Sequence, residues 1–179
     1  MNNYIEKEIK VLNVNIEQTK KRLEEMGAQM VFNNKRMIST FDYYDNRCLK
    51  NDLLIRLTVE NKNVKITTHL NNSKDNRKII KIHPFEDETI CKDFLNALGL
   101  EEQTKLESYR VSYELGRIDF DIDQFPGIPP FMEIDIEFLD IPLKELLKKL
   151  NLEENQVVFC GTESIFALYG LNYYSLFKI

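Results

Sequence analysis

Alternation between acidic and apolar side chains, strict over residues 118–123 and 132–138 of the segments 117–124 and 131–138, constrains the fold of this chain more than any other feature. Successive side chains on a β-strand point to opposite faces, so each segment predicts a strand with one acidic and one apolar face. Residues 4–12 alternate in a similar way. The charged positions that share a face are Asp119, Asp121 and Asp123, then Glu133, Asp135 and Glu137, and finally Glu6, Glu8 and Lys10.

Two interpretations of these acidic rows are open. Most alternating strands turn their polar side chains to water, so a solvated outer face is the simpler interpretation. The rows over residues 117–124 and 131–138 are purely acidic, however, and like charges on neighbouring strands repel. Oxygen ligands suit hard cations such as Mg²⁺ or Mn²⁺, so a divalent metal between the strands would make the same rows favourable.

The rest of the chain predicts many strands and few helices. We expect helices over residues 16–26, 87–98, 143–150 and 163–169. We expect strands over residues 4–12, 31–44, 53–59, 64–70, 77–82, 108–115, 117–124 and 131–138. This series favours an α+β fold that is mainly antiparallel, closed as a β-barrel with peripheral helices, over a doubly wound parallel sheet. No linker divides it, so residues 1–179 are predicted to form a single domain.

Composition excludes several classes of function. A net charge of −5 argues against a general nucleic-acid surface, and no segment approaches the length of a membrane span. The N-terminus is too charged for a signal peptide, and Cys48, Cys91 and Cys160 lack disulfide or CxxC spacing, so a cytoplasmic protein is expected. His69 and His83 are too few for a zinc site of the usual kind.

Two motifs carry a family resemblance. Residues 6–10, Glu-Lys-Glu-Ile-Lys, are similar to an N-terminal ExExK signature. Residues 120–135 look like a pair of strands in which an aspartate precedes a turn and an ExE pair follows. The Pro-Gly-Ile-Pro turn at residues 126–129 and the Tyr169-Gly170 stretch are similar to one bacterial branch. The chain therefore resembles the CYTH, or triphosphate tunnel, family over essentially its whole length.

This resemblance implies an antiparallel tunnel of about eight strands, with acidic residues that bind one or two divalent metals and basic residues that bind a triphosphate. It assigns Mg²⁺ or Mn²⁺ to a carboxylate side consisting of Glu6, Glu8, Asp123, Glu133 and Asp135. It assigns the phosphate chain, and a catalytic role, to Lys10, Arg56 and Arg110, the last of which matches the arginine of a KxR element.

The basic side departs from the family pattern. Arg56 stands where two arginines are usual, with Leu54 or Thr58 at the partner position, and Ser108 replaces the KxR lysine. His69 replaces another lysine and is a further candidate catalytic residue, either as a general base or as a phosphate contact that charges below neutrality. An ordinary strand histidine is the alternative. Three other lysines are candidate replacements on this side: Lys62, Lys65 and Lys81.

The resemblance leaves three functions open. Members of the family include thiamine triphosphatases, inorganic triphosphatases and class IV adenylyl cyclases, so metal-dependent hydrolysis of a triphosphate compound is the first expectation. A cyclase that makes cyclic AMP from ATP is the second, and it also needs a purine pocket. A binding protein without turnover is the third, since the basic side is depleted. The expected partner is a small-molecule triphosphate, and the expected state is a monomer or a homodimer.

Overall fold

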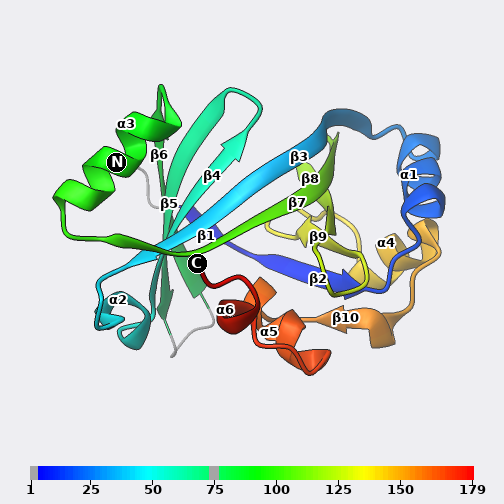
Figure 1. Ribbon diagram of the computed structural model, residues 1–179. Helices are drawn as coiled ribbons and strands as arrows, with labels where there is room; N and C mark the ends of the chain where they lie inside the picture. The colour runs from blue at the N-terminus through cyan, green and yellow to red at the C-terminus, as the bar shows by residue number, and fades with distance from the viewer. Residues whose placement is uncertain (1–3, 73–76) are drawn as a thin grey trace. The chain divides into compact units, whose positions relative to one another are not determined.

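The computed structural model describes residues 4–72 and 77–179, and within them it contains ten strands and six α-helices (Figure 1). The strands are β1 Tyr4–Glu6, β2 Glu8–Leu12, β3 Gln29–Asp42, β4 Leu53–Glu60, β5 Asn63–Asn72, β6 Arg77–Phe85, β7 Glu101–Leu115, β8 Ile118–Gln124, β9 Phe131–Asp135 and β10 Val157–Val158. The helices are α1 Ile16–Glu25, α2 Arg47–Lys50, α3 Glu88–Ala97, α4 Leu143–Leu150, α5 Thr162–Leu168 and α6 Tyr173–Leu176, and a 3₁₀ turn, η1, spans Glu154–Gln156.

The strands form one mainly antiparallel sheet, in the order β1-β6-β5-β4-β3-β7-β8-β9-β2-β10, and the helices are peripheral to it. This confirms the predicted α+β class. The expectation of eight strands is wrong for the described residues, which contain ten. Lys7 interrupts the expected strand over residues 4–12, and the short β10 pairs with β2. The strand order ends at β1 and β10. Closure of the sheet into a barrel stays a prediction.

The chain divides into two compact units, and neither is continuous in sequence. Unit 1 contains Met1–Glu6, Lys35–Glu107 and Leu171–Ile179, and unit 2 contains Lys7–Asn34 and Ser108–Gly170. The long strands β3 and β7 contribute residues to both units. The single domain expected from the sequence stays a prediction.

Unit 2 has a hydrophobic core on one face of its strands. Alternate residues of β2, β7, β8 and β9 supply this face, and α1 and α4 cover it with leucines. Its fully buried members include Ile9, Tyr113, Phe120 and Ile134. Each such side chain contributes about 2 kcal/mol through burial. The apolar rows of the sequence therefore face the helices, and the charged rows lie on the opposite face.

Unit 1 follows the same design with α3 as the cover. Phe41, Leu57 and Ile66 pack with Cys91 and Leu95 of α3 in a second core. The Asp87 side chain caps α3 by accepting from the N–H groups of Thr89 and Ile90, as an N-cap residue does. Gly99 follows α3 at a φ of +79°, a conformation in which a side chain would be strained.

Most predicted elements are present, with shifted ends. The strand expected over residues 131–138 ends at Asp135, whose side chain accepts the N–H of Glu137 and turns the chain. The strand expected from residue 108 begins earlier, at Glu101. Residues 101–107 have one apolar residue, Leu106, so the alternation of buried Thr104, Leu106 and Ser108 is not visible in the sequence. Among residues 4–72 and 77–179, no helix is both long and apolar enough to cross a membrane.

Candidate functional site

The polar face of unit 2 gathers the charged side chains of four neighbouring strands. Across the β2–β9 ladder, Glu8 lies opposite Asp135 and Lys10 lies opposite Glu133. Across the next ladders, Asp121 lies opposite Glu133 on β9 and opposite Ser112 on β7, and Asp123 lies opposite Arg110. We call these residues the carboxylate face: Glu8, Lys10, Arg110, Ser112, Asp119, Asp121, Asp123, Glu133 and Asp135.

Lys10 lies inside this face, with 1 % of its side chain exposed. Its ammonium forms ion pairs with Glu8 and, at 2.9 Å, with Oε1 of Glu133. Burial by itself lowers the pKa of Lys10, but the two carboxylates outweigh burial and raise the pKa above its ordinary value. Lys10 is therefore a permanent cation at neutral pH.

Arg110 is held even more tightly. Its guanidinium makes a bidentate contact with Asp123, an ion pair of 2.7 Å with Oε2 of Glu133 and a third ion pair with Asp121. Burial lowers the pKa of Arg110, and the three carboxylates raise it well above its ordinary value. The planar fork of arginine suits this bidentate pairing, which a lysine could not reproduce.

The interpretation of the acidic rows as a solvated outer face is not supported. The exposed side-chain fractions are 0 % for Asp123, 15 % for Glu133 and 17 % for Glu8. Two internal cations, Lys10 and Arg110, compensate the buried negative charge. The resemblance assigned these cations to a separate basic side, whereas the structure places them among the carboxylates.

Sequence reasoning missed three members of this face, Ser112, Asp119 and Asp121. Asp121 and Ser112 were given no role, although Asp121 is the middle residue of the acidic row and the alternation itself pointed to it. Asp119 ends the same row, where burial first and then the neighbouring Glu114, Asp121 and Asp135 raise its pKa above the ordinary value. The side chain of Glu6, another predicted metal ligand, lies outside the described residues.

The predicted residues of unit 1 lie on the polar face of that unit. Arg56 is opposite Thr40 on β3 and Thr67 on β5, and its Nε donates to Thr67 Oγ1 at 3.4 Å. His69, which is 8 % exposed, lies opposite Leu54 on this same face. The structure thus brings His69 and Arg56 to one face of unit 1.

Two further cations share this polar face. The first is Lys65, which lies opposite Thr58 and forms a 2.9 Å ion pair with Glu60. The second is Arg36. Lys81, in contrast, lies opposite Thr68 on the other face of the sheet. Sequence reasoning missed Arg36, which is 5 % exposed and lies opposite Glu60. No amphipathic pattern distinguishes it in the polar run that precedes residue 37.

The donor chemistry of the carboxylate face fits Mg²⁺ or Mn²⁺, since its anionic groups supply oxygen atoms and lie on one face. Within residues 4–72 and 77–179, no three of these groups are arranged around a common metal position. Lys10 and Arg110 instead form ion pairs with Glu8, Asp121, Asp123 and Glu133. A metal would therefore bind in competition with these two side chains.

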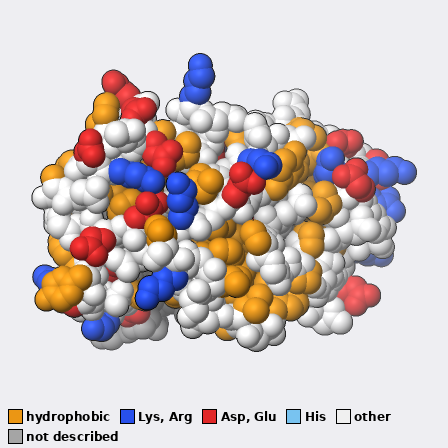
Figure 2. All heavy atoms as spheres, in the orientation of Figure 1, with side chains coloured by type: hydrophobic (Ala, Val, Ile, Leu, Met, Phe, Trp, Pro, Cys, Tyr) orange, Lys and Arg blue, Asp and Glu red, His pale blue; other side chains and the backbone are white. Residues whose placement is uncertain are grey.

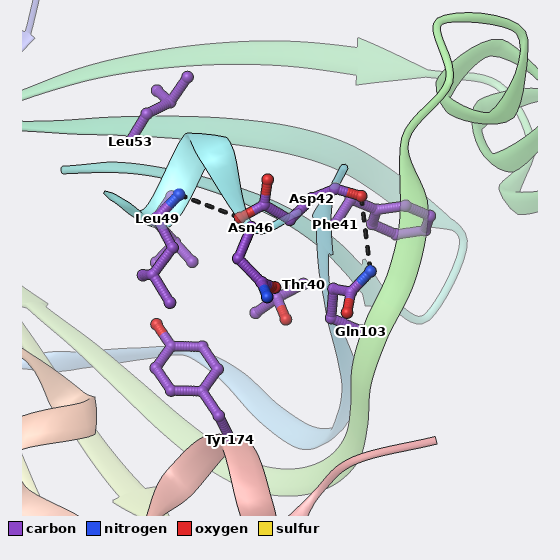
Figure 3. A pocket seen from close by; sticks show the side chains of 9 residues that line it. Thr40, Phe41, Asp42, Asn46, Leu49, Leu53, Gln103 and Tyr174 are labelled. Carbon is purple, nitrogen blue, oxygen red and sulfur yellow. Dashed lines mark hydrogen bonds between the residues drawn. The ribbon is translucent and has the colours of Figure 1, made fainter. Parts of the chain in front are cut away.

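Unit 1 also has a small pocket beside this polar face (Figure 3). Figure 3 shows Tyr174 of α6 pointing toward Leu49 of α2, with Thr40 and Gln103 also lining the pocket. Its volume of about 30 Å³ is room for about two water molecules, which is too little for a purine ring. The pocket does not supply the nucleotide site that a cyclase needs.

Charged side chains of both signs are interspersed over the face of the molecule seen in Figure 2. The candidate site residues are not these exposed side chains. They are the buried or partly buried charged side chains on the polar faces of unit 1 and unit 2.

Comparison with solved structures identifies the fold. The chain is similar to an X-ray structure from Vibrio parahaemolyticus described as a "putative adenylate cyclase", with a TM-score of 0.79, 14 % identity, and coverage of 93 % of this chain and 99 % of that one. It is similar to the PH1012 protein of Pyrococcus horikoshii, with a TM-score of 0.68, 19 % identity, and coverage of 87 % and 96 %.

A third similar structure is HpAC1 from Hippeastrum, described as an adenylyl cyclase candidate that reveals a dominant triphosphatase activity. Its TM-score is 0.61 at 11 % identity, with coverage of 92 % of this chain and 95 % of that one. No protein-family model and no curated protein sequence matches the chain. At these identities the similarity establishes the fold alone.

Proposed function

We propose that this protein is a metal-dependent triphosphate hydrolase of the CYTH type, which binds its substrate inside a closed β-barrel. The observation that carries the proposal is the buried, partly compensated carboxylate face of Glu8, Lys10, Arg110, Asp123 and Glu133. Buried charges on this scale cost stability compared with an apolar core. Their presence on a strand face that the helices leave uncovered supports a role in binding charged ligands.

Chain connectivity supports closure of the barrel. β1 pairs with β6 in unit 1, and β2 pairs with β9 in unit 2. Only Lys7 separates β1 from β2, so one nearly continuous strand takes part in the ladders at both ends of the sheet order β6-β5-β4-β3-β7-β8-β9. We propose that β1 and β2 together act as the eighth strand, and that β10 is an addition outside the barrel.

The residues of this chain have separate parts in the proposed function. Lys10 and Arg110 supply permanent positive charge toward phosphate oxygens, since both remain protonated at any physiological pH. Arg56 supplies a further guanidinium from the polar face of unit 1, with His69 on the same face. Positioned cations of this kind stabilise the charge that develops in phosphoryl transfer.

Glu8, Asp123, Glu133 and Asp135 would hold the Mg²⁺ or Mn²⁺ ion, together with Glu6 by the family resemblance. When bound, such an ion neutralises phosphate charge and lowers the pKa of a coordinated water. The carboxylates orient and retain the ion, and their burial keeps water from screening the interaction.

Binding without efficient turnover is the second candidate function. His69, Ser108 and either Leu54 or Thr58 stand where the family usually has cations. Loss of one positioned donor can lower the rate about a hundredfold. Adenylyl cyclase activity is the third, supported by the description of the similar structure from Vibrio parahaemolyticus.

One experiment separates these functions. Release of phosphate and of cyclic AMP is measured from ATP, inorganic triphosphate and thiamine triphosphate, with Mg²⁺ and with Mn²⁺. Phosphate release that requires the metal supports the hydrolase, and cyclic AMP supports the cyclase. Tight triphosphate binding without either product supports the binding protein.

A restoration variant tests the depleted basic side. The double change Ser108→Lys and His69→Lys is expected to raise phosphate release from inorganic triphosphate, because it returns two cations to family positions. The matched control is Lys81→Ala, whose residue lies on the other face of unit 1 and should leave the rate unchanged. A slower double variant would show that His69 or Ser108 has a positive role.

A further inference from the structure

The proposed function leaves two acidic residues of the carboxylate face unused, Asp119 and Asp121, and of these Asp121 contacts Arg110. Asp121 lies directly opposite Ser112 on one side and Glu133 on the other. Its Oδ1 accepts a hydrogen bond from the Ser112 hydroxyl, and its Oδ2 pairs with Nη1 of Arg110. Both carboxylate oxygens are thus engaged, and the carboxylate is fixed in one orientation.

Each carboxylate around Arg110 contacts particular nitrogens of the guanidinium, and Asp121 contacts Nη1. The guanidinium has five N–H donors. Asp123 accepts from Nε and Nη2, and Glu133 accepts from Nη2 at 2.7 Å. These contacts and the contact of Nη1 with Asp121 account for four of the five donors, and the fifth N–H is also on Nη1. An incoming anion would therefore approach Nη1, the nitrogen whose other N–H points to Asp121.

The charge around Arg110 also opposes the binding of an anion. Arg110 carries one positive charge and pairs directly with three carboxylates, those of Asp121, Asp123 and Glu133. The group therefore carries a net charge of about two negative units, which opposes the approach of a phosphate. Neutralising Asp121 alone would halve this excess and release Nη1, while the bidentate contact with Asp123 kept the guanidinium in place.

We propose that Asp121, oriented by Ser112, is a positioning residue that holds Arg110 on the carboxylate face and restrains its binding of anions. Asp121 thereby sets the balance between two uses of one guanidinium, as counter-ion to the carboxylates and as a ligand for phosphate. The inference rests on the proposed function only in its choice of inorganic triphosphate as the anion.

Asp121→Asn is the decisive variant, and Asp119→Asn is its matched control. Asp119 is on the same strand and face and carries the same charge, but its partner across the ladder is Glu114. Binding of inorganic triphosphate is measured by calorimetry in the presence of a metal chelator. We expect Asp121→Asn to bind about tenfold more tightly than the unaltered protein, and Asp119→Asn to change the affinity by less than about twofold. Ser112→Ala should give an intermediate gain.

A second readout reports on Arg110 without any ligand. In ¹⁵N-detected NMR spectra, rotation of the Arg110 guanidinium should be slow in the unaltered protein and in Asp119→Asn. It should be faster in Asp121→Asn, because the hold on Nη1 is lost. Equal rotation in all three proteins overturns the proposal, as does an equal gain in triphosphate affinity from both variants or a loss of affinity in Asp121→Asn.

Failure of the proposed function would look different. If neither the unaltered protein nor Asp121→Asn binds triphosphate, whether with the chelator or with added Mg²⁺ or Mn²⁺, the proposed function is wrong, and rotation of the guanidinium then decides the positioning role. Faster rotation confined to Asp121→Asn supports that role, and unchanged rotation overturns it.

Discussion

Lys10 and Glu133 face each other across the β2–β9 ladder, with Lys10 Nζ 2.9 Å from Glu133 Oε1. The other oxygen of Glu133 lies 2.7 Å from Nη2 of Arg110, so one carboxylate joins both buried cations. A family-based assignment makes Glu133 a metal ligand. In the structure Glu133 also has a second role, because its two oxygens compensate part of the positive charge of Lys10 and Arg110.

The change Glu133→Gln tests this role. Removing this carboxylate leaves Lys10 paired with Glu8 alone and Arg110 paired with Asp121 and Asp123. Two hydrogen bonds between charged groups are lost, so we expect a loss of about 3 kcal/mol in the free energy of unfolding. Urea denaturation in a metal-free buffer measures it. Glu137→Gln is the control, since Glu137 is exposed on the turn that follows β9, and it should change stability by less than about 0.5 kcal/mol. Equal stability of both variants would contradict the compensating role.

The change Lys10→Met gives a test by pH. The pKa of Lys10 is raised above its ordinary value of 10.5 in the folded protein, so its stabilising contribution is fully present below pH 10.5. The contribution is lost as the pH rises through the folded pKa. We therefore expect Lys10→Met to cost about 3 kcal/mol at neutral pH, and the difference from the unaltered protein to shrink in alkaline buffers. Lys144→Met, at an exposed position, is the control for general alkaline effects.

Asp119→Asn should stabilise the protein at neutral pH. The pKa of Asp119 is raised, first by burial and then by Glu114, Asp121 and Asp135, so its ionised form opposes folding. As the pH falls, the folded state takes up this proton before the unfolded state does, and the opposition disappears. The gain in melting temperature should therefore be present at neutral pH and vanish in acid. A gain that grew in acid would contradict the assigned direction of the shift.

Arg56→Gln tests the polar face of unit 1. A hydrogen bond to a charged group contributes about 1.5–3 kcal/mol, so the affinity for inorganic triphosphate should fall about tenfold to a hundredfold. Arg47→Gln is the matched control, because the Arg47 guanidinium pairs with Asp45 and lies over the ring of Tyr43 instead. An unchanged affinity in Arg56→Gln would exclude Arg56 from the site.

The sequence predicted the fold well where alternation was strong. In β8 and β9, acidic and apolar residues alternate with a period of two. This alternation predicted both the strands and the face to which each side chain points. β7 was predicted too short, since Leu106 is the one apolar residue among residues 101–107. Helix α2 was missed because its four residues are stabilised from outside, by Asp42, which accepts the N–H groups of Cys48 and Leu49.

The sequence predicted which residues are candidates for the site, but it did not predict how they are arranged relative to one another. Residue type and strand parity placed Glu8, Asp123 and Glu133 on shared faces, and the structure brings them to one face of unit 2. Parity cannot tell which strands become neighbours, however. The pairing of β7 with β8 takes Arg110 to Asp123, and the pairing of β2 with β9 takes Lys10 to Glu133. Those pairings, rather than any local pattern, put the cations among the carboxylates.

The division of the chain also bears on how it folds during synthesis. Unit 1 includes Leu171–Ile179, where Phe177 accepts a backbone hydrogen bond from Lys105 and Ile179 donates one to Gln103. Unit 2 needs both Lys7–Asn34 and Ser108–Gly170. Most multi-unit proteins complete their N-terminal part first as the ribosome advances. Here unit 1 combines an early segment, Met1–Glu6, with a late segment, Leu171–Ile179, so it is completed only after the segments of unit 2 have been synthesised. Until then the nascent chain exposes unpaired strand edges, so its yield in cells should depend on chaperones more than its size suggests.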